Sequence, residues 1–185
     1  ANDRSLRMQA AGGAGTAVYD ATSKSDAARF SFVADREMTL FGAMNLHLTI
    51  ETDAGDDLDV FAAVYKENAQ GKRLHHITLR APGAQAFVRS LERDGKLPAA
   101  VSYTGPVGRL RASHRALDAA KSTALVPVHR HADEQRVAAG TPVDLQIGLW
   151  PTAMRLHAGE RLVLEIGGHP VGPLAMVMPG ESGLP

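Results

Sequence analysis

Apolar and polar residues alternate along several segments of this chain. From Met44 to Ile50, every second side chain is apolar, so one side of an extended segment would face a core and the other would face water. Similar short apolar segments recur both before and after this one. The predicted strands are residues 29–33, 39–52, 58–64, 143–149 and 162–166.

Turn-forming residues separate these segments. The Asp- and Gly-rich residues 53–57 divide the first two long strands, and the Ala-Gly-Glu string at 158–160 precedes the last strand. Pro151 is expected to end the strand before it, because proline cannot donate a backbone hydrogen bond to a ladder. The final strand is expected to stop at Gly167 and Gly168.

Helical periodicity is weak by comparison. Residues 84–93 space their apolar side chains three to four positions apart, and Gly95 follows as a C-terminal stop, which predicts a short surface helix. One further helical turn is expected at residues 114–120. The whole pattern predicts an all-β chain, folded as an antiparallel β-sandwich or jelly roll with one or two short helices.

Composition narrows the class of protein. The 185 residues carry 20 Lys plus Arg and 20 Asp plus Glu, a balance that disfavours nucleic-acid and anionic-membrane partners, since those need clustered basic residues. Cysteine is absent, which excludes disulfides, thiolate zinc ligands and cysteine nucleophiles. No apolar run approaches the roughly 18 residues that a membrane span requires. We therefore expect a cytoplasmic protein with no nucleic-acid or membrane partner.

One folded domain is expected for a chain of this length. Residues 1–16, which include an Ala- and Gly-rich stretch, are interpreted as an N-terminal extension or linker, and residues 17–178 as the β-sandwich. Residues 179–185 have the composition of a loop. We therefore expect the chain to be truncated before a last strand of the sandwich.

Two common catalytic motifs are missing from the sequence. The serine nucleophile of an α/β-hydrolase lies in a Gly-x-Ser-x-Gly turn, whereas the nearest string, residues 180–183, has the wrong spacing. The glycine-rich residues 12–15 lack the lysine of a phosphate-binding loop. The sequence therefore predicts no catalytic apparatus and no cofactor in this chain, and leaves open whether the chain is part of an enzyme.

Two clusters contain residue types that bind metal ions. His129 and His131, with Asp133 and Glu134 nearby, could supply imidazole and carboxylate ligands, and the four aspartates of residues 53–59 could bind calcium. The first cluster lies in a charged stretch that is typical of an ion-paired loop, and the second lacks the spacing of a calcium-binding EF-hand. We expect no metal, and aspartate side chains that satisfy backbone amides in turns.

Arginines are concentrated in one short segment. Arg109, Arg111 and Arg115 lie within seven residues, where their guanidinium groups could bind carboxylates within the domain or across an interface. Asp118 is the expected intramolecular partner. Trp150, the only tryptophan, is interpreted as a core or interface anchor, with a sugar-stacking platform as the alternative.

Long collinear stretches resemble a known family. The string Gly-Arg-Leu-Arg-Ala-Ser-His-Arg-Ala-Leu-Asp at residues 108–118, followed by Ser122, Pro127 and His129, resembles the C-terminal domain of the X-Pro dipeptidyl-peptidase and cocaine esterase family of serine hydrolases. The likeness runs in the same order over most of residues 17–168. It also includes residues 30–32, 37–42, 56–61, 149–152 and 158–162.

The resemblance implies a galactose-binding-like jelly roll that packs against an N-terminal α/β-hydrolase domain. In that family the catalytic serine, aspartate and histidine belong to the hydrolase domain, and the sandwich helps to wall the substrate pocket. The family pattern also continues with one more strand beyond the end of this chain. Residues 81–100 have no clear counterpart in the family, and their role is left open.

The first hypothesis is therefore a non-catalytic C-terminal domain of a serine hydrolase that acts on proline-containing peptides or on acyl esters and amides. The alternative is a stand-alone carbohydrate-binding or interaction module of jelly-roll fold. The oligomeric state is left open: a homo-oligomer is one possibility, because the isolated domain would expose the face that its partner covers, and such apolar patches tend to self-associate. The residues expected to form a structural or interface network are Arg111, His114, Arg115, Asp118, His129 and Trp150.

Overall fold

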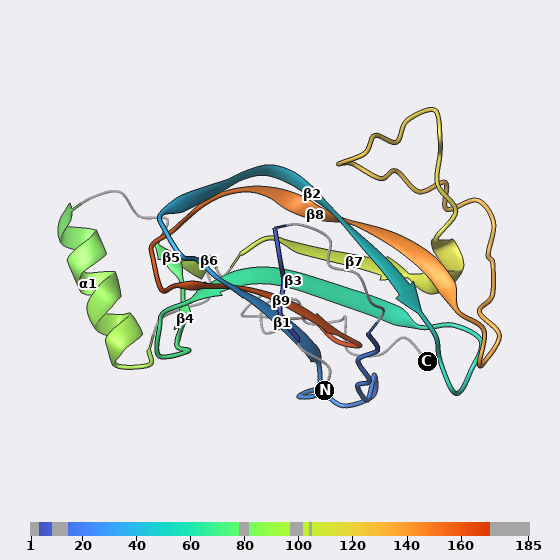
Figure 1. Cartoon of the computed structure of the whole chain (residues 1–185), viewed down its shortest axis with the longest axis horizontal. Helices are drawn as coiled ribbons and strands as arrows, with labels where there is room; N and C mark the ends of the chain where they lie inside the picture. The colour runs from blue at the N-terminus through green and yellow to red at the C-terminus, as the bar shows by residue number, and fades with distance from the viewer. Residues whose placement is uncertain (1–3, 9–14, 78–81, 97–101, 104, 171–185) are drawn as a thin grey trace.

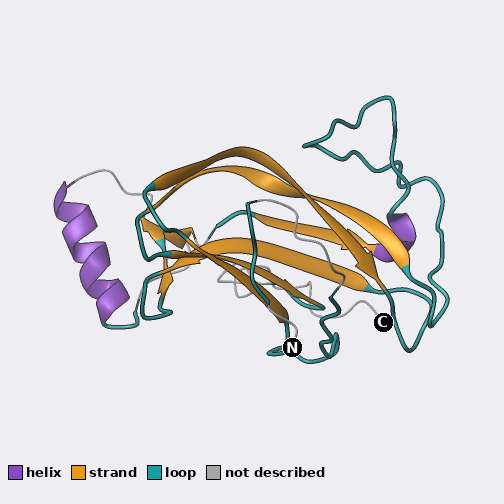
Figure 2. Ribbon diagram, viewed as in Figure 1, coloured by secondary structure: helices purple, strands orange, loops and turns teal. Residues whose placement is uncertain are grey.

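A computed structural model describes residues 4–8, 15–77, 82–96, 102–103 and 105–170. Two layers of strands lie above one another, with a helix at one end and a long connection that projects at the other end (Figure 1; Figure 2). The elements in chain order are β1 (Ala28–Val33), β2 (Met38–Ile50), β3 (Asp59–Glu67), β4 (Arg73–Leu74), β5 (His76–Ile77), α1 (Pro82–Arg93), β6 (Ser102–Tyr103), β7 (Val107–Arg111), β8 (Val143–Leu156) and β9 (Arg161–Gly167).

Five strands form the larger layer, in the order β1-β9-β3-β4, with β7 also paired to β3. All of these pairs are antiparallel, and Tyr65 of β3 lies opposite Val163 of β9. At the β1 edge, Ser5 forms an isolated parallel bridge with Ser31. Residues 4–6 therefore lie along this layer and cover part of its edge, through backbone hydrogen bonds of Arg4 and Leu6 with Ser31.

The second layer consists of β2 and β8, which pair antiparallel along their whole length. Trp150 and Pro151 of β8 lie opposite the single residue Ala43 of β2, where the register shifts at a β-bulge. The prediction that Pro151 ends this strand is wrong, since β8 continues to Leu156. The bulge leaves Pro151 out of the ladder, so its missing N–H does not interrupt the pairing on either side.

The main core lies between the two layers. Val60 of β3, Leu110 of β7 and Ile166 of β9 pack with Leu145 and Ile147 of β8, and each is at most 5% exposed. A fully buried aliphatic side chain of this size contributes about 1.5–3 kcal/mol relative to an exposed one. The apolar rows that predicted the strands therefore also identify the faces that meet in the core.

Glycine is required where β7 passes close to β8. A β-carbon built on Gly108 would lie 2.5 Å from the carbonyl oxygen of Gly148, closer than real β-carbons approach such an atom. Any larger residue at position 108 would push the two layers apart at this point. The close approach also brings the end of β7, and the residues that follow it, against the second layer.

The helix predicted from its spacing is confirmed as α1. It ends as expected near Gly95, whose φ of +68° lies in the left-handed region that glycine adopts without steric cost. The Lys96 N–H then donates to the carbonyl oxygen of Leu91 at 2.8 Å, which satisfies a carbonyl at the helix end. Val88 is buried, whereas Phe87 on the other side of the helix is 63% exposed.

The further helical turn expected at residues 114–120 does not form over those residues. A short 3-10 turn occupies Ala112–His114, directly after β7. Leu117 forms an isolated antiparallel bridge with His129, and a residue in such an extended pair cannot continue a helix. The prediction is wrong because a segment farther along the chain competes for the same backbone groups.

The all-β sandwich is confirmed, and the strands predicted at residues 29–33, 39–52, 58–64, 143–149 and 162–166 all form. Residues 179–185, expected to be a loop, lie outside the described residues. So does much of the segment interpreted as an N-terminal extension. Among the described residues, no helix is long and apolar enough to cross a membrane. The finer galactose-binding-like assignment stays a prediction.

Candidate functional site

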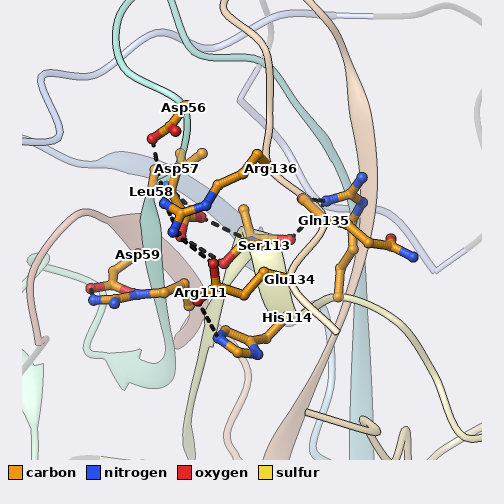
Figure 3. Close-up of polar contacts among 12 residues, drawn as sticks. Asp56, Asp57, Leu58, Asp59, Arg111, Ser113, His114, Glu134, Gln135 and Arg136 are labelled. Atoms are coloured by element: carbon orange, nitrogen blue, oxygen red, sulfur yellow. Dashed lines mark hydrogen bonds and ion pairs between the residues drawn. The ribbon is translucent and has the colours of Figure 1, made fainter. Parts of the chain in front are cut away.

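Arg111, the last residue of β7, pairs with Asp59, the first residue of β3, because the antiparallel register places the two residues opposite each other. The guanidinium Nε and Nη2 donate to the two carboxylate oxygens at 2.9 and 2.8 Å (Figure 3). The hydrogen bond and the charge of Asp59 raise the pKa of Arg111 above its usual range. Because both side chains are nearly half exposed, the pair contributes only about 0.2–1 kcal/mol to stability.

Asp57 and Ser113 form a more buried pair beside the first one. One carboxylate oxygen of Asp57 accepts from the Ser113 N–H at 2.9 Å, and the other accepts from the Ser113 hydroxyl at 2.6 Å (Figure 3). Burial raises the pKa of Asp57, but these bonds and that from the Leu58 N–H outweigh it and lower the pKa. The hydroxyl of Ser113 is completely buried and bound to a carboxylate, so it is not placed to act as a nucleophile.

These contacts anchor the start of residues 112–142, the long segment between β7 and β8 that is called the connection below. Arg115 donates through Nη1 to the carbonyl oxygens of Ala112 and Gln135. In return, the Gln135 N–H donates to the carbonyl oxygen of Ser113 at 2.7 Å. The outgoing and returning parts of the connection are therefore tied together near the sandwich.

Arg136 adds a further ion-paired group to the returning part. Its Nη2 lies 2.6 Å from a carboxylate oxygen of Glu134, and its Nη1 lies 3.5 Å from Asp56 (Figure 3). The next residue, Val137, is completely buried, and its N–H donates to the Asp56 carbonyl oxygen at 2.8 Å. Asp56 and Asp57 thus bind arginine, serine and backbone groups of the connection.

Asp118 has a different role from the one expected. It pairs with Lys121 at 3.1 Å, and its other carboxylate oxygen accepts from the Ala120 N–H at 3.1 Å. The prediction that Asp118 is the intramolecular partner of the arginines is wrong, since Arg111 binds Asp59 instead. Asp118 stabilises a turn inside the projecting part of the connection, where its N–H also donates to the carbonyl oxygen of Val128.

Three histidines gather within the connection. The ring centroids of His114 and His131 are 5.6 Å apart, and those of His129 and His131 are 5.8 Å apart. Burial lowers the pKa of His129; a hydrogen bond with the Gln146 backbone opposes this shift, and the nearby His131 adds to it. In the described part of the chain, no group of three His, Cys, Asp or Glu side chains is arranged to hold a metal ion.

Trp150 lies on the surface rather than in the core. It is 56% exposed, at the bulge of β8. Phe41 of β2 points to the same outward side, and its side chain is 83% exposed. Sequence reasoning missed Phe41, although its position in the outward row of an alternating strand was the available signal. Of the roles expected for Trp150, an interface anchor and a stacking platform remain.

A second polar cluster was also missed; it lies on the outward side of the five-stranded layer. The Tyr65 hydroxyl donates to Glu165 at 2.5 Å, and the Arg73 guanidinium carbon lies 3.6 Å from the centroid of the Tyr65 ring. Arg73 also pairs with Glu165 at 3.2 Å, and Arg29 pairs with Glu67 at 2.5 Å. Burial and the bond to Glu165 raise the pKa of Tyr65 to about 12.

This architecture is similar to one part of several solved hydrolase structures. A crystal structure of a CocE/NonD family hydrolase from Staphylococcus aureus is similar to 92% of this chain, with a TM-score of 0.77 and 26% sequence identity. A second structure of a CocE/NonD family hydrolase from that organism is similar to 83% of the chain, with a TM-score of 0.69 and 26% identity. An α-amino acid ester hydrolase, at 14% identity and a TM-score of 0.50, covers 80% of this chain and shares the fold alone.

The chain spans only about a quarter of the length of these hydrolases: 28% and 25% of the two S. aureus chains and 19% of the ester hydrolase. No curated protein matches it. A family model described as the X-Pro dipeptidyl-peptidase C-terminal non-catalytic domain matches residues 4–171. The match covers both layers of the sandwich and the whole connection, so the chain belongs to the family of X-Pro dipeptidyl-peptidase C-terminal non-catalytic domains.

Proposed function

We propose that this domain packs against the catalytic α/β-hydrolase domain of a serine hydrolase and helps to shape its substrate pocket. The observation that carries the proposal is the size relation: 92% of this chain corresponds to 28% of a CocE/NonD family hydrolase. The parent reaction that fits is hydrolysis by an X-Pro dipeptidyl-peptidase or an acyl esterase or amidase. The domain itself supplies scaffold and surface, and its Ser113 hydroxyl is completely buried against Asp57.

The polar network gives the domain a way to present a fixed surface. Arg111 and Arg115 hold the start and the return of the connection, and Asp118 and His129 order the part that projects beyond them. A loop that is tied at several points loses less conformational entropy when a partner binds it. In this proposal the network positions the connection to meet the hydrolase domain, and His114 belongs to the same packed region.

The experiment compares the isolated chain with the hydrolase polypeptide that carries it. We expect the isolated chain to release no product from p-nitrophenyl acetate, and the whole polypeptide to hydrolyse it. Removal of residues 17–178 from the whole polypeptide is expected to lower both activity and the melting temperature, because the hydrolase domain loses a packed neighbour. Hydrolysis by the isolated chain alone, or an unchanged enzyme after the deletion, would contradict the proposal.

A carbohydrate-binding module is the second candidate, and the exposed Trp150 is the observation that favours it. An exposed aromatic ring can stack on a sugar ring, and Phe41 lies on the same side of the β2–β8 layer. Calorimetric titration of the isolated chain with galactose and with short oligosaccharides tests this reading. Heat of binding that disappears in Trp150→Ala would favour the module over the hydrolase domain.

The cytoplasmic location expected from the sequence, and the self-association left open there, also belong to this proposal. The apolar residues on the outward side of β2 and β8 are the surface through which the isolated chain would self-associate. Analytical ultracentrifugation of the isolated chain over a range of concentrations measures this directly.

A further inference from the structure

The outward side of the β2–β8 layer is divided into a covered part and a bare part. In the covered part, the Asn45 side-chain amide of β2 donates to the carbonyl oxygen of Ala124 at 3.2 Å. Pro127 lies close against Gly148 of β8, since a β-carbon built on Gly148 would be 3.3 Å from the proline ring. The connection therefore lies directly on this half of the layer.

The bare part begins where the connection ends. Trp150 is two residues beyond Gly148 on β8, a distance of about 7 Å along a strand, and Phe41 lies on β2 near the same bulge. Phe41 is 83% exposed and Trp150 is 56% exposed. Ala153 of β8, opposite Phe41 in the register, is exposed as well. An aromatic surface is thus left open beside a covered one.

The connection extends this apolar surface. Leu125 and Val126, between the two covering residues, are 59% and 48% exposed. Their backbone is ordered, because the Thr123 N–H donates to the Val126 carbonyl oxygen at 2.9 Å. Figure 1 shows the connection rising above the β2–β8 layer at one end.

Near the bare part, charged side chains at the end of β8 and just before β2 are paired with one another. Arg155 of β8 lies 3.2 Å from Glu37, and His157 also lies 3.2 Å from a carboxylate oxygen of Glu37. A surface whose edge is internally neutralised and whose centre is aromatic fits an apolar protein surface better than a highly charged partner. Nothing in the balance of 20 basic and 20 acidic residues favours an ionic partner instead.

We propose that Phe41 and Trp150, with Leu125 and Val126, form the docking surface for the hydrolase domain of the same polypeptide. The inference rests on the proposed function and specifies which face meets that domain. The S. aureus hydrolase supports this occupant. This domain matches 28% of that chain, so the other 72% lies outside the matched part. A covalently linked neighbour is present at a high effective concentration, so it is better placed than a free partner to cover an exposed apolar face.

The absence of cysteine from the sequence makes this surface directly testable. Trp150→Cys and Phe41→Cys each place a single thiol of this domain on the proposed docking surface, and Phe87→Cys on α1 is the matched control because Phe87 is 63% exposed. Each variant is prepared as the isolated chain and within the whole hydrolase polypeptide. Maleimide labelling is followed at the level of the peptide, so that cysteines elsewhere in the polypeptide do not interfere.

We expect labelling at positions 41 and 150 to be at least about tenfold slower in the whole polypeptide than in the isolated chain, as for a site that reacts only on transient opening. Labelling at position 87 is expected to be equally fast in both. Equal rates at all three positions would overturn the assignment. Protection that appears in the isolated chain and increases with its concentration would also overturn it, in favour of a second copy of the chain.

The two proposals fail in different ways. If the deletion of the domain abolishes activity while positions 41 and 150 label freely in the whole polypeptide, the domain serves the hydrolase but docks through another face. If the isolated chain hydrolyses the ester by itself, the proposed function fails whatever the labelling shows. Circular dichroism of each cysteine variant verifies that the sandwich is intact, and the variant at position 41 tests the surface independently of the one at position 150.

Discussion

The two outward faces of the sandwich differ in how their aromatic residues are treated. On the five-stranded layer, Tyr65 is completely buried, its hydroxyl bound by Glu165 and its ring covered by Arg73. On the β2–β8 layer, Phe41 and Trp150 are largely exposed. The first face buries its aromatic residue and pairs its polar groups, whereas the second leaves aromatic side chains exposed.

This difference separates what the domain needs to fold from what it offers to a partner. The cluster around Tyr65 joins Arg29 of β1, Arg73 of β4 and Glu165 of β9, so it couples strands that are far apart in the sequence. Phe41 and Trp150, in contrast, lie on two strands that pair directly with each other. Substitutions on the five-stranded layer should therefore mainly lower stability, whereas substitutions on the β2–β8 layer should mainly weaken docking.

The largest expected effect comes from truncating one aromatic residue on each face. Tyr65→Ala is expected to cost about 3–5 kcal/mol of unfolding free energy, because it leaves a cavity under Arg73 and removes a partner of Glu165. Phe41→Ala is expected to change the unfolding free energy of the isolated chain by no more than about 0.5 kcal/mol, since the side chain is 83% exposed. Urea unfolding monitored by circular dichroism measures both, and equal losses would remove the distinction between the faces.

The polar network of the connection offers a second, smaller contrast, between a buried pair and an exposed pair. Ser113→Ala is expected to cost about 1–3 kcal/mol, since it removes the hydroxyl donor from the carboxylate of Asp57 in a buried position. Arg111→Ala is expected to cost at most about 1 kcal/mol, because its pair with Asp59 is nearly half exposed. Thermal melting of the two variants compares them, and a larger loss for Arg111→Ala would show that the exposed pair is the main anchor.

Acidification tests the same buried pair, Ser113 and Asp57, through the carboxylate of Asp57. The pKa of Asp57 is lowered in the folded state, so its contribution is present above the unfolded value of 3.8 and is lost as the pH falls through the folded pKa. The stability of the wild type should therefore decline below pH 3.8 more steeply than that of Asp57→Asn. Identical slopes in urea unfolding at pH 2–5 would contradict this assignment.

Tyr65 predicts a change at the alkaline end. Its pKa is about 12 in the folded state, against 10.0 for the unfolded side chain. Below pH 10 the phenol is neutral in both states, and its contribution is then lost as the pH rises from 10 to about 12, because the unfolded chain releases the proton first. Urea unfolding at pH 9–11 should show a steeper decline for the wild type than for Tyr65→Phe. A decline of the same slope in both would assign the pH dependence to other groups.

The elements and the core faces could be predicted from the sequence, because alternation with a period of two specifies both a strand and its buried side. The strand predicted at residues 143–149 forms, and its alternating apolar row, which includes Leu145 and Ile147, lies in the core. The continuation of β8 through Pro151 could not be predicted from the sequence, because the bulge that accommodates the proline depends on the opposing strand. An alternating pattern predicts the local geometry of a strand but not the register between paired strands.

The same limit explains the candidate site. Arg111 was recognised as a carboxylate-binding residue, but its partner Asp59 is 52 positions away and is fixed only by the pairing of β3 with β7. Tyr65 and Glu165, 100 positions apart, meet through the pairing of β3 with β9 in the same way. Residue types that need partners can be identified from sequence, whereas the identity of the partner requires the topology.

The smallest expected effect concerns His129 of the connection, which forms a hydrogen bond with the Gln146 backbone of β8. Burial and the neighbouring His131 lower the pKa of His129 below 6.5 in the folded state. As the pH falls below 6.5, the unfolded chain takes up a proton before the folded one does, so stability decreases. His129→Gln should make this part of the stability profile flatter, and His47→Gln, at an exposed position of β2, serves as the control. If both variants keep the slope of the wild type between pH 5 and 7, the pKa of His129 is not lowered in the folded state.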